Sequence, residues 1–181
     1  MRFTGLPIAG AFRIDIERHE DARGFFARTF CIEEFAQHGL VTQFVQHSVS
    51  FNRCSGTLRG LHYQASTHAE SKLVRCTAGS AFDVVVDLRR SSGTFGRWHG
   101  ELISASNYSM IYVPEGCAHG FQTLADATEL FYEISPAYVP AAARGIAYDD
   151  ADLAIRWPLA PTSVSDADRG RPSFRAAELF A

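Results

Sequence analysis

The sequence predicts an all-β protein built as an antiparallel sandwich or barrel. Three runs rich in β-branched and aromatic residues have the composition of strands, and they cover Ala81–Leu88, Ser109–Pro114 and Thr128–Ile134. Clusters of glycine, serine, asparagine and proline separate these runs, and no long helical pattern lies between them. Short intervals without helices favour antiparallel pairing over a parallel sheet whose strands are joined by helices.

The length of 181 residues suits a single domain, which we expect to span residues 1–181. Its parts would be N-terminal strands with a short helix at 1–45, a β core at 46–135, and C-terminal loops with short helices at 136–181. The best internal helix covers Ile32–His38, with a start near Thr29 and an end at Gly39. Several prolines break the C-terminal part, so we expect it to fold over the β core.

Composition narrows the class of protein and its partners. Hydrophobic residues make up 46% of the chain and charged residues 20%, as in globular proteins. A formal net charge of −3 gives no indication of nucleic acid or an anionic membrane as a partner. No apolar run has the length of a signal peptide or a membrane span, so we expect a cytoplasmic protein. The four cysteines are widely spaced, which predicts free thiols and neither disulfides nor a zinc site.

The segment Gly56–Gln64 reads GTLRGLHYQ and holds a candidate base. Arg59 and His62 are three residues apart and would point to opposite faces of a regular strand. Gly60 lies between them and is a natural position for a bulge, which would bring both side chains into one cavity. A cation beside the imidazole would favour the neutral form of His62, which can accept a proton. The alternative is a structural strand with an incidental histidine.

Lys72 is the only lysine among 17 basic residues, and the other 16 are arginines. It shares a strand face with Val74 and Cys76, where a lysine is unusual unless the face lines a polar pocket. The alternative is a lysine at the rim whose ammonium reaches water. Two further candidates, Tyr132 and Tyr138, lie in the stretch FYEISPAY. In a functional site, one hydroxyl would transfer a proton and one ring would stack on a ligand.

The stretch Pro114–Phe121 reads PEGCAHGF and contains P-x-G-x-x-H, the second half-motif of cupin barrels. In a metal-binding cupin, the first half-motif supplies H-x-H followed by a glutamate. The equivalent stretch here runs from His62 to Gln64 and lacks the second histidine, while His68 and Glu70 follow at the wrong spacing. The sequence therefore predicts a cupin-type jelly roll that uses acid–base chemistry. A metal-dependent cupin oxygenase or isomerase is an alternative.

These motifs occur together and in order, and the chain from about residue 5 to about residue 172 resembles the dTDP-4-dehydrorhamnose 3,5-epimerase family. The matching segments are D-x-R-G-F-F at 21–26, G-T-L-R-G-L-H-Y-Q at 56–64, K-L-V-R at 72–75, V-D-L-R-R-S-S-x-T-F-G at 86–96, P-E-G-x-A-H-G-F at 114–121, R-G-I at 144–146 and S-x-x-D-R at 165–169. The resemblance implies a metal-free cupin jelly roll that is usually a homodimer and needs no cofactor. It implies a nucleotide-sugar substrate, a dTDP-4-keto-6-deoxyhexose inverted at C3 and C5.

The resemblance also implies a role for each matched residue. His62 would remove the proton next to the C4 ketone, and Tyr132 would be the acid on the opposite face of the sugar. Asp168 would orient His62, with Asp83 as a rival, and Lys72 would hold the C4 oxygen as it becomes an enolate. The implied substrate-binding set contains Arg23 and Arg59 for the diphosphate, Tyr138 for the nucleobase, His119 and Gln46 for the sugar, and Phe26 and Arg169 within the matched motifs.

Three stretches depart from the pattern of the family. Ala27 and Arg28 stand where the family usually has Phe and Glu, Gln46–Ser50 has lost an Asp and an Asn, and Glu133 stands where Lys is common. These departures keep two variants of the reaction open, a C3-only epimerase of a related deoxysugar pathway and an enzyme for a different nucleotide. A non-catalytic cupin that binds a sugar nucleotide is a further alternative.

Overall fold

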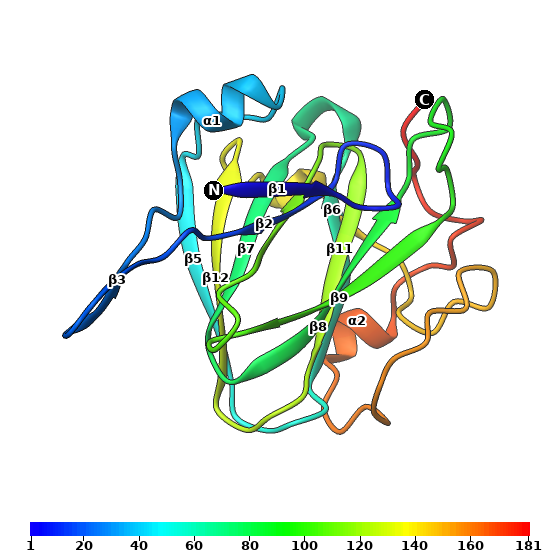
Figure 1. Ribbon diagram of the computed structural model, residues 1–181. Coiled ribbons are helices and arrows are strands. Elements are labelled where there is room, and N and C mark those ends of the chain that lie inside the picture. Colours follow the sequence, from blue (N-terminus) through cyan, green and yellow to red (C-terminus); the bar gives the residue numbers. More distant parts are fainter.

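Two antiparallel sheets face each other as a jelly roll in the computed structural model, which describes residues 1–181 (Figure 1). The first sheet has the strand order β1 (Arg2–Gly5), β2 (Phe12–Asp15), β10 (Met110–Val113), β7 (Ser71–Ala78), β12 (Thr128–Ser135) and β5 (Gln46–Asn52). The second has the order β13 (Ala143–Gly145), β6 (Leu58–Gln64), β11 (Cys117–Thr123), β8 (Ser80–Asp87) and β9 (Trp98–Ser104). The predicted all-β class and the cupin-type jelly roll are confirmed.

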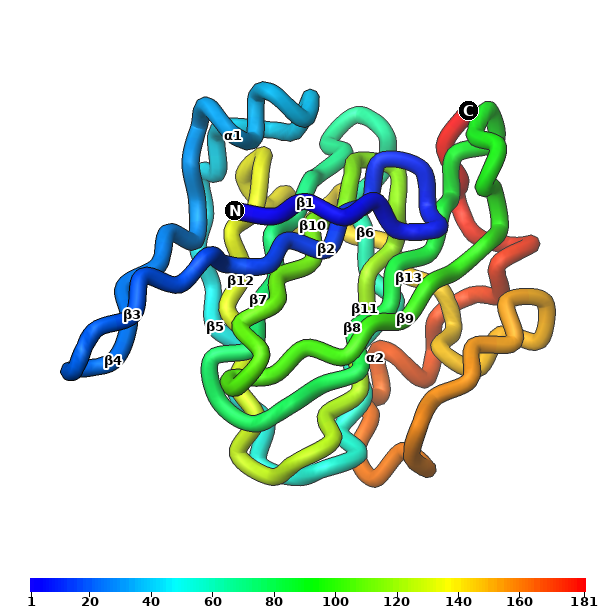
Figure 2. The backbone as a smooth tube through the Cα atoms, in the orientation of Figure 1, coloured from blue at the N-terminus to red at the C-terminus, as the bar shows by residue number.

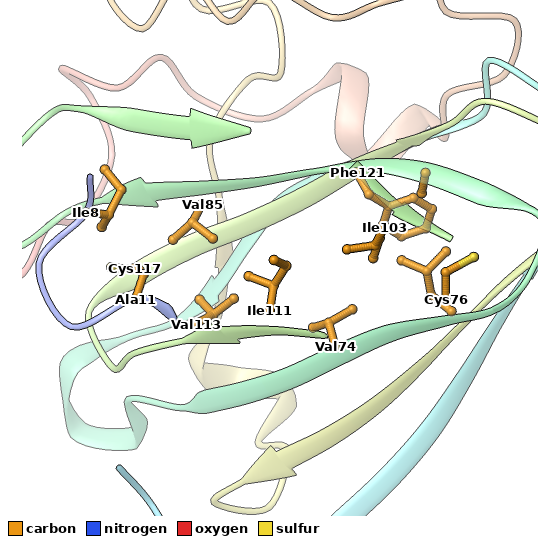
Figure 3. Close-up of a cluster of buried hydrophobic side chains, with 12 residues drawn as sticks. Ile8, Ala11, Val74, Cys76, Val85, Ile103, Ile111, Val113, Cys117 and Phe121 are labelled. Atoms are coloured by element: carbon orange, nitrogen blue, oxygen red, sulfur yellow. The ribbon is translucent and has the colours of Figure 1, made fainter. Parts of the chain in front are cut away.

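The main hydrophobic core lies between the two sheets (Figure 3). Val74 on β7 and Ile111 on β10 meet Val85 on β8 and Phe121 on β11, and all four side chains are at most 2% exposed. Burying a side chain of this size stabilises the fold by about 1.5–3 kcal/mol. The packed core occupies one part of the space between the sheets and holds the walls of the remaining part in place.

Strand β8 shows how the sequence places a charged residue inside. Its run of three valines is buried on both faces, because Val85 joins the core between the sheets while Val84 and Val86 pack under the C-terminal segment. Side chains alternate along a strand, so Asp83 shares the inward face with Val85. The exposed fraction of Asp83 is only 1%. A carboxylate buried this deeply needs a hydrogen-bond partner, and the partner of Asp83 is His119 on the neighbouring strand β11.

The C-terminal segment covers the outer face of the second sheet, as the sequence predicted. Ile146 and Leu153 are buried there against strands β6 and β8, and Trp157 and Phe174 pack at the margin. In Figures 1 and 2 this orange and red part of the chain lies beside the second sheet. The sequence did not reveal that residues 143–145 form β13, which pairs with β6. Besides this strand, the segment contains a 3-10 turn at Pro140–Ala142 and the helix α2 (Asp166–Arg169).

The N-terminal part adds a helix and a projecting arm. The helix α1 covers Ile32–Gln37 and begins after Cys31 instead of near Thr29. Phe30, which lies two residues before the helix, packs on Phe35 with the ring centroids 4.8 Å apart. Cys31, the N-cap residue, has an extended backbone, so the helix does not begin earlier. Strands β3 (His19–Asp21) and β4 (Gly24–Phe26) form the arm, all of whose residues are exposed and which extends away from the barrel in Figures 1 and 2. No helix is long and apolar enough to cross a membrane.

Candidate active site

A cavity of about 370 Å³ opens between the two sheets, beyond the end of the packed core. One wall carries His62 on β6 and His119 on β11, from the second sheet. The other wall carries Lys72 on β7 and Tyr132 on β12, from the first sheet. Residues that the sequence placed in separate motifs therefore line one cavity.

The predicted bulge at Gly60 is present. Arg59 pairs with Phe121 and His62 pairs with His119, so three steps on β6 match two steps on β11. This mismatch turns both Arg59 and His62 into the cavity. Gly60 has φ +130°, and a Cβ atom there would lie 2.6 Å from the Cα atom of Gly120. Only glycine allows this close approach of the two strands.

His62 is held by a carboxylate from the C-terminal segment. Its Nε2 atom lies 2.6 Å from Oδ1 of Asp168, whose other oxygen faces the amide of Gly60 at 3.5 Å. Burial opposes ionisation of Asp168, but the hydrogen bond and charge of His62 outweigh it and lower the pKa of this carboxyl. The His62 side chain is 41% exposed, so the imidazole remains open to a ligand. Asp168, and not its rival Asp83, is the carboxylate on His62.

Asp83 instead bonds to the second histidine of the cavity. His119 Nε2 lies 2.7 Å from Oδ2 of Asp83, and the exposed fractions of the two side chains are 4% and 0%. The ring of His119 meets that of Tyr132 edge to face at 5.7 Å. Burial raises the pKa of Tyr132 well above its ordinary value, and the charge of Asp83 raises it further against the opposing effect of Arg59. Tyr132 is therefore a protonated phenol over the whole neutral range.

Lys72 points into the cavity, as predicted from its strand face. Its Nζ atom lies 2.9 Å from Oε1 of Glu70 and donates a hydrogen bond of 3.3 Å to the carbonyl oxygen of His62. The amide of Gln64 donates to the other oxygen of Glu70 at 3.1 Å. Both charged side chains are 8% exposed, so this ion pair is largely removed from water. The ammonium group is fixed beside the backbone of the strand that carries His62.

The predicted substrate-binding residues divide into two groups. Arg59, His119 and Tyr138 line the cavity, and Arg59 Nε donates to the side-chain oxygen of Asn52 at 2.8 Å. Gln46 lies beside the site, where its side-chain oxygen accepts a hydrogen bond from the backbone amide of Tyr138.

The other three predicted residues lie outside the cavity of their own subunit. Arg23 is at the tip of the arm with its side chain 89% exposed, and Phe26 on β4 is 77% exposed. Arg169 ends α2 and is exposed, without a place in the cavity lining. Within a single chain none of the three lines the cavity, and their role in substrate binding stays a prediction. An arm that extends into solvent and a side chain on the outer face of a short helix cannot reach inward.

Several polar residues that the sequence did not single out also line the cavity. Gln64, Glu70, Arg144 and Arg171 are among them. Gln64 could have been predicted, because it follows His62 by two residues and alternate residues of a strand point to the same face. The two arginines come from the proline-broken C-terminal segment, for which no periodic pattern was available. No group of three or more His, Cys, Asp or Glu residues is arranged to hold a metal ion.

The chain is similar to known epimerases over nearly its whole length. The family model described as dTDP-4-dehydrorhamnose 3,5-epimerase matches residues 5–176. The enzyme of that name from Shigella flexneri is 42% identical over 161 residues, which is 88% of each chain. A crystal structure of the enzyme from Elizabethkingia anophelis matches with a TM-score of 0.94 and 36% identity over 97% of each chain. A 3′-monoepimerase from Streptomyces bikiniensis, in complex with dTDP-quinovose, matches with a TM-score of 0.87 and 34% identity, covering 94% of this chain and 86% of that one. The chain therefore belongs to the dTDP-4-dehydrorhamnose 3,5-epimerase family.

Proposed function

We propose that the protein epimerises C3 and C5 of a nucleotide-linked 4-keto-6-deoxyhexose, in a reaction of the dTDP-4-dehydro-6-deoxyglucose to dTDP-4-dehydrorhamnose type. One observation carries the proposal beyond family membership. A carboxylate-held imidazole on one wall of the cavity faces a protonated tyrosine on the other wall. Inversion at a carbon requires proton removal on one face and proton return on the opposite face. Two groups on opposing walls meet that requirement.

The proposed chemistry follows from the placement of these groups. His62 accepts the proton from the carbon next to the C4 ketone, and the electron pair of that C–H bond forms the C=C bond of an enolate. The C4 oxygen takes the negative charge, and the ammonium of Lys72 stabilises it. Tyr132 then donates its proton to the other face of the carbon, and the ketone forms again. A positioned base of this kind typically contributes about 10²–10⁴-fold to the rate.

We further propose that a homodimer completes the site. Arg23 and Phe26 have no role in their own subunit, yet they lie on an arm that projects far enough to meet another molecule. Strand β5 is the edge of the first sheet and exposes Val49 and Phe51. An exposed apolar edge strand favours pairing with a second chain. The arm of one subunit would then bring its arginine and phenylalanine to the cavity of its partner.

We also propose that the protein is a single domain located in the cytoplasm. Residues 1–181 act as one cupin-type domain, because Asp168 of the C-terminal segment bonds to His62 of the β core. A cytoplasmic location agrees with four cysteines that are all free thiols. The substrate chemistry requires only acid–base groups, and the proposed reaction uses no cofactor.

Proton exchange with solvent tests the reaction. The protein is incubated in deuterium oxide with 4-keto-6-deoxyglucose linked to dTDP, and separately to other nucleoside diphosphates, and the label is located by NMR. We expect deuterium at both C3 and C5, and a His62→Ala variant should incorporate it about 10²–10⁴-fold more slowly. Label at C3 alone would assign the monoepimerase reaction that the Streptomyces bikiniensis protein is named for.

Two further outcomes would overturn the proposal. Label at neither C3 nor C5, with every nucleotide tried, would indicate a protein that only binds the sugar nucleotide. In such a protein, His62→Ala would leave function unchanged. Stoichiometric iron, manganese or zinc on elemental analysis of the active protein, with activity lost on chelation, would favour the metal-dependent alternative.

A further inference from the structure

Arg171 lines the cavity, lies outside every matched motif and has no role in the proposed mechanism. It follows the end of α2 by two residues and lies near the carboxylate that holds His62, with its Nε atom 3.9 Å from Oδ1 of Asp168. That oxygen is already bonded to His62 at 2.6 Å. The Nε atom of Arg171 is buried and has no hydrogen-bond partner. A buried donor without a partner is unusual in a folded protein and calls for an explanation.

The charges around the cavity leave two cations without a close carboxylate of their own. Lys72 is paired with Glu70 at 2.9 Å, and Arg144 is paired with Glu178 at 2.8 Å. Arg59 has only the neutral amide oxygen of Asn52. Arg171 has only the distant and already occupied oxygen of Asp168. Two guanidinium groups therefore face one cavity with unused capacity for an anion.

The backbone leaves room for Arg171 at this position. Gly145 on β13 pairs with His62, and a Cβ atom at Gly145 would lie 2.7 Å from Nε of Arg171. The φ angle of Gly145 is not in the left-handed region, so the reason for glycine here is space and not conformation. The arginine side chain thus packs on the bare backbone of β13, next to the base. Its side chain is 28% exposed, which keeps part of the guanidinium accessible.

We propose that Arg171 is a substrate-binding residue which, together with Arg59, binds the diphosphate of the nucleotide sugar. This inference rests on the proposed function, because it needs a substrate that carries a diphosphate. A planar guanidinium donates two parallel hydrogen bonds to phosphate oxygens, and such charge-assisted bonds are about twice as strong as neutral ones. Arg169, which the family resemblance placed in the substrate-binding set, is exposed outside the cavity, whereas Arg171 lines it.

Calorimetric titration with two probes, inorganic pyrophosphate and dTDP, tests this assignment. The Arg171→Gln variant should bind both about 10- to 100-fold more weakly than the unchanged protein, the loss typical of one hydrogen bond to a charged group. Arg171→Lys keeps the charge but loses the two parallel donors of the guanidinium, so its affinity for both probes should lie between those of the unchanged protein and Arg171→Gln. Added salt should reduce the difference by screening. Arg175→Gln is the matched control for net charge, because Arg175 is 82% exposed and pairs with Asp152 outside the cavity. Thermal unfolding confirms that each variant is folded.

The outcomes separate this inference from the proposed function. If the unchanged protein binds neither probe and turns over no nucleotide sugar, the proposed function fails. If the unchanged protein binds dTDP and Arg171→Gln binds it equally well, the role of Arg171 is overturned while the function stands. A fall in kcat with unchanged affinity for both probes would also overturn it, because Arg171 would then act through Asp168.

Discussion

The two histidine–carboxylate pairs of the cavity are alike in geometry and different in surroundings. His62 and His119 are partners across the β6–β11 ladder, and their bonds to Asp168 and Asp83 are 2.6 Å and 2.7 Å long. The side chain of His62 is 41% exposed, whereas that of His119 is 4% exposed. Hydrogen bonds of nearly equal length thus hold the His62 imidazole where a ligand can reach it and the His119 imidazole in the protein interior.

The source of each carboxylate explains the difference. Asp83 belongs to the strand next to His119, so the barrel alone forms that pair and buries it. Asp168 belongs to α2, which packs on the barrel from outside after the chain has crossed the outer face of the second sheet. An imidazole that is oriented yet open is suited to accept a proton from a ligand. A buried one is suited to fix its neighbours, above all Tyr132.

Replacement of the open histidine should have the largest effect. His62→Ala removes the proposed base, so deuterium exchange into the substrate should fall by about 10²–10⁴-fold. The melting temperature should change little, because the side chain is partly exposed. Exchange assays and thermal unfolding on the same preparation measure both quantities. Normal exchange in this variant would eliminate His62 as the base.

Lys72→Arg is expected to rank second. The ammonium lies beside the carbonyl of His62, and loss of one donor to a developing oxyanion typically costs about 10²–10³-fold in kcat. The bulkier guanidinium keeps the charge but cannot occupy the same buried position against Glu70. Steady-state kinetics should show this loss mainly in kcat. Turnover close to normal would contradict the assignment of Lys72 to the enolate.

Asp168→Asn and Asp83→Asn distinguish the two carboxylates. A hydrogen bond to a charged group is typically worth about 1.5–3 kcal/mol, so we expect Asp168→Asn to reduce activity about 10- to 100-fold. Asp83→Asn should mainly lower the free energy of unfolding, by about 1–3 kcal/mol, because it alters a buried hydrogen bond. Kinetics and denaturant titrations of both variants provide the comparison. The reverse ranking in the two assays would contradict the division of roles.

A smaller effect is expected in the pH dependence of the free energy of unfolding of Asp168→Asn. The pKa of Asp168 lies below its ordinary 3.8 in the folded protein, so its stabilising contribution is present above pH 3.8 and is lost as the pH falls through the lowered value. The stability difference between the unchanged protein and Asp168→Asn should therefore shrink in acid. A difference that persists unchanged at low pH would show that the carboxylate charge is not its source.

The pKa of Tyr132, the proposed acid, should respond to the charge of Asp83 in the buried His119–Asp83 pair. The pKa of Tyr132 is raised well above 10.0 by burial and by Asp83, so its proton is retained below pH 10 and lost only well above it. Asp83→Asn removes the negative charge, and the alkaline loss of activity should then begin at a lower pH. Tyrosinate absorbance, compared with a Tyr132→Phe variant, follows the titration. An unshifted alkaline limb would show that Asp83 does not act on Tyr132.

Local patterns predicted the parts of the site that one strand determines by itself. The glycine between Arg59 and His62 indicated the bulge, and alternation along β7 placed Lys72 inward. Patterns could not place residues whose position depends on long-range packing. Arg171 reaches the cavity only because the C-terminal segment folds over the second sheet and Gly145 leaves space. Arg23 and Phe26 matched a motif, but their distance from the cavity depends on the direction of the arm, which no local pattern specifies.

The division of work between the two walls can be measured directly in Tyr132→Phe. This variant keeps the imidazole that we propose removes the proton and lacks the phenol that we propose returns one to the opposite face. In deuterium oxide, we predict that the recovered substrate carries deuterium next to the ketone with its original configuration, because exchange occurs through His62 alone. Inversion at an unchanged rate would contradict the account, and so would exchange that survives in His62→Ala but disappears in Tyr132→Phe.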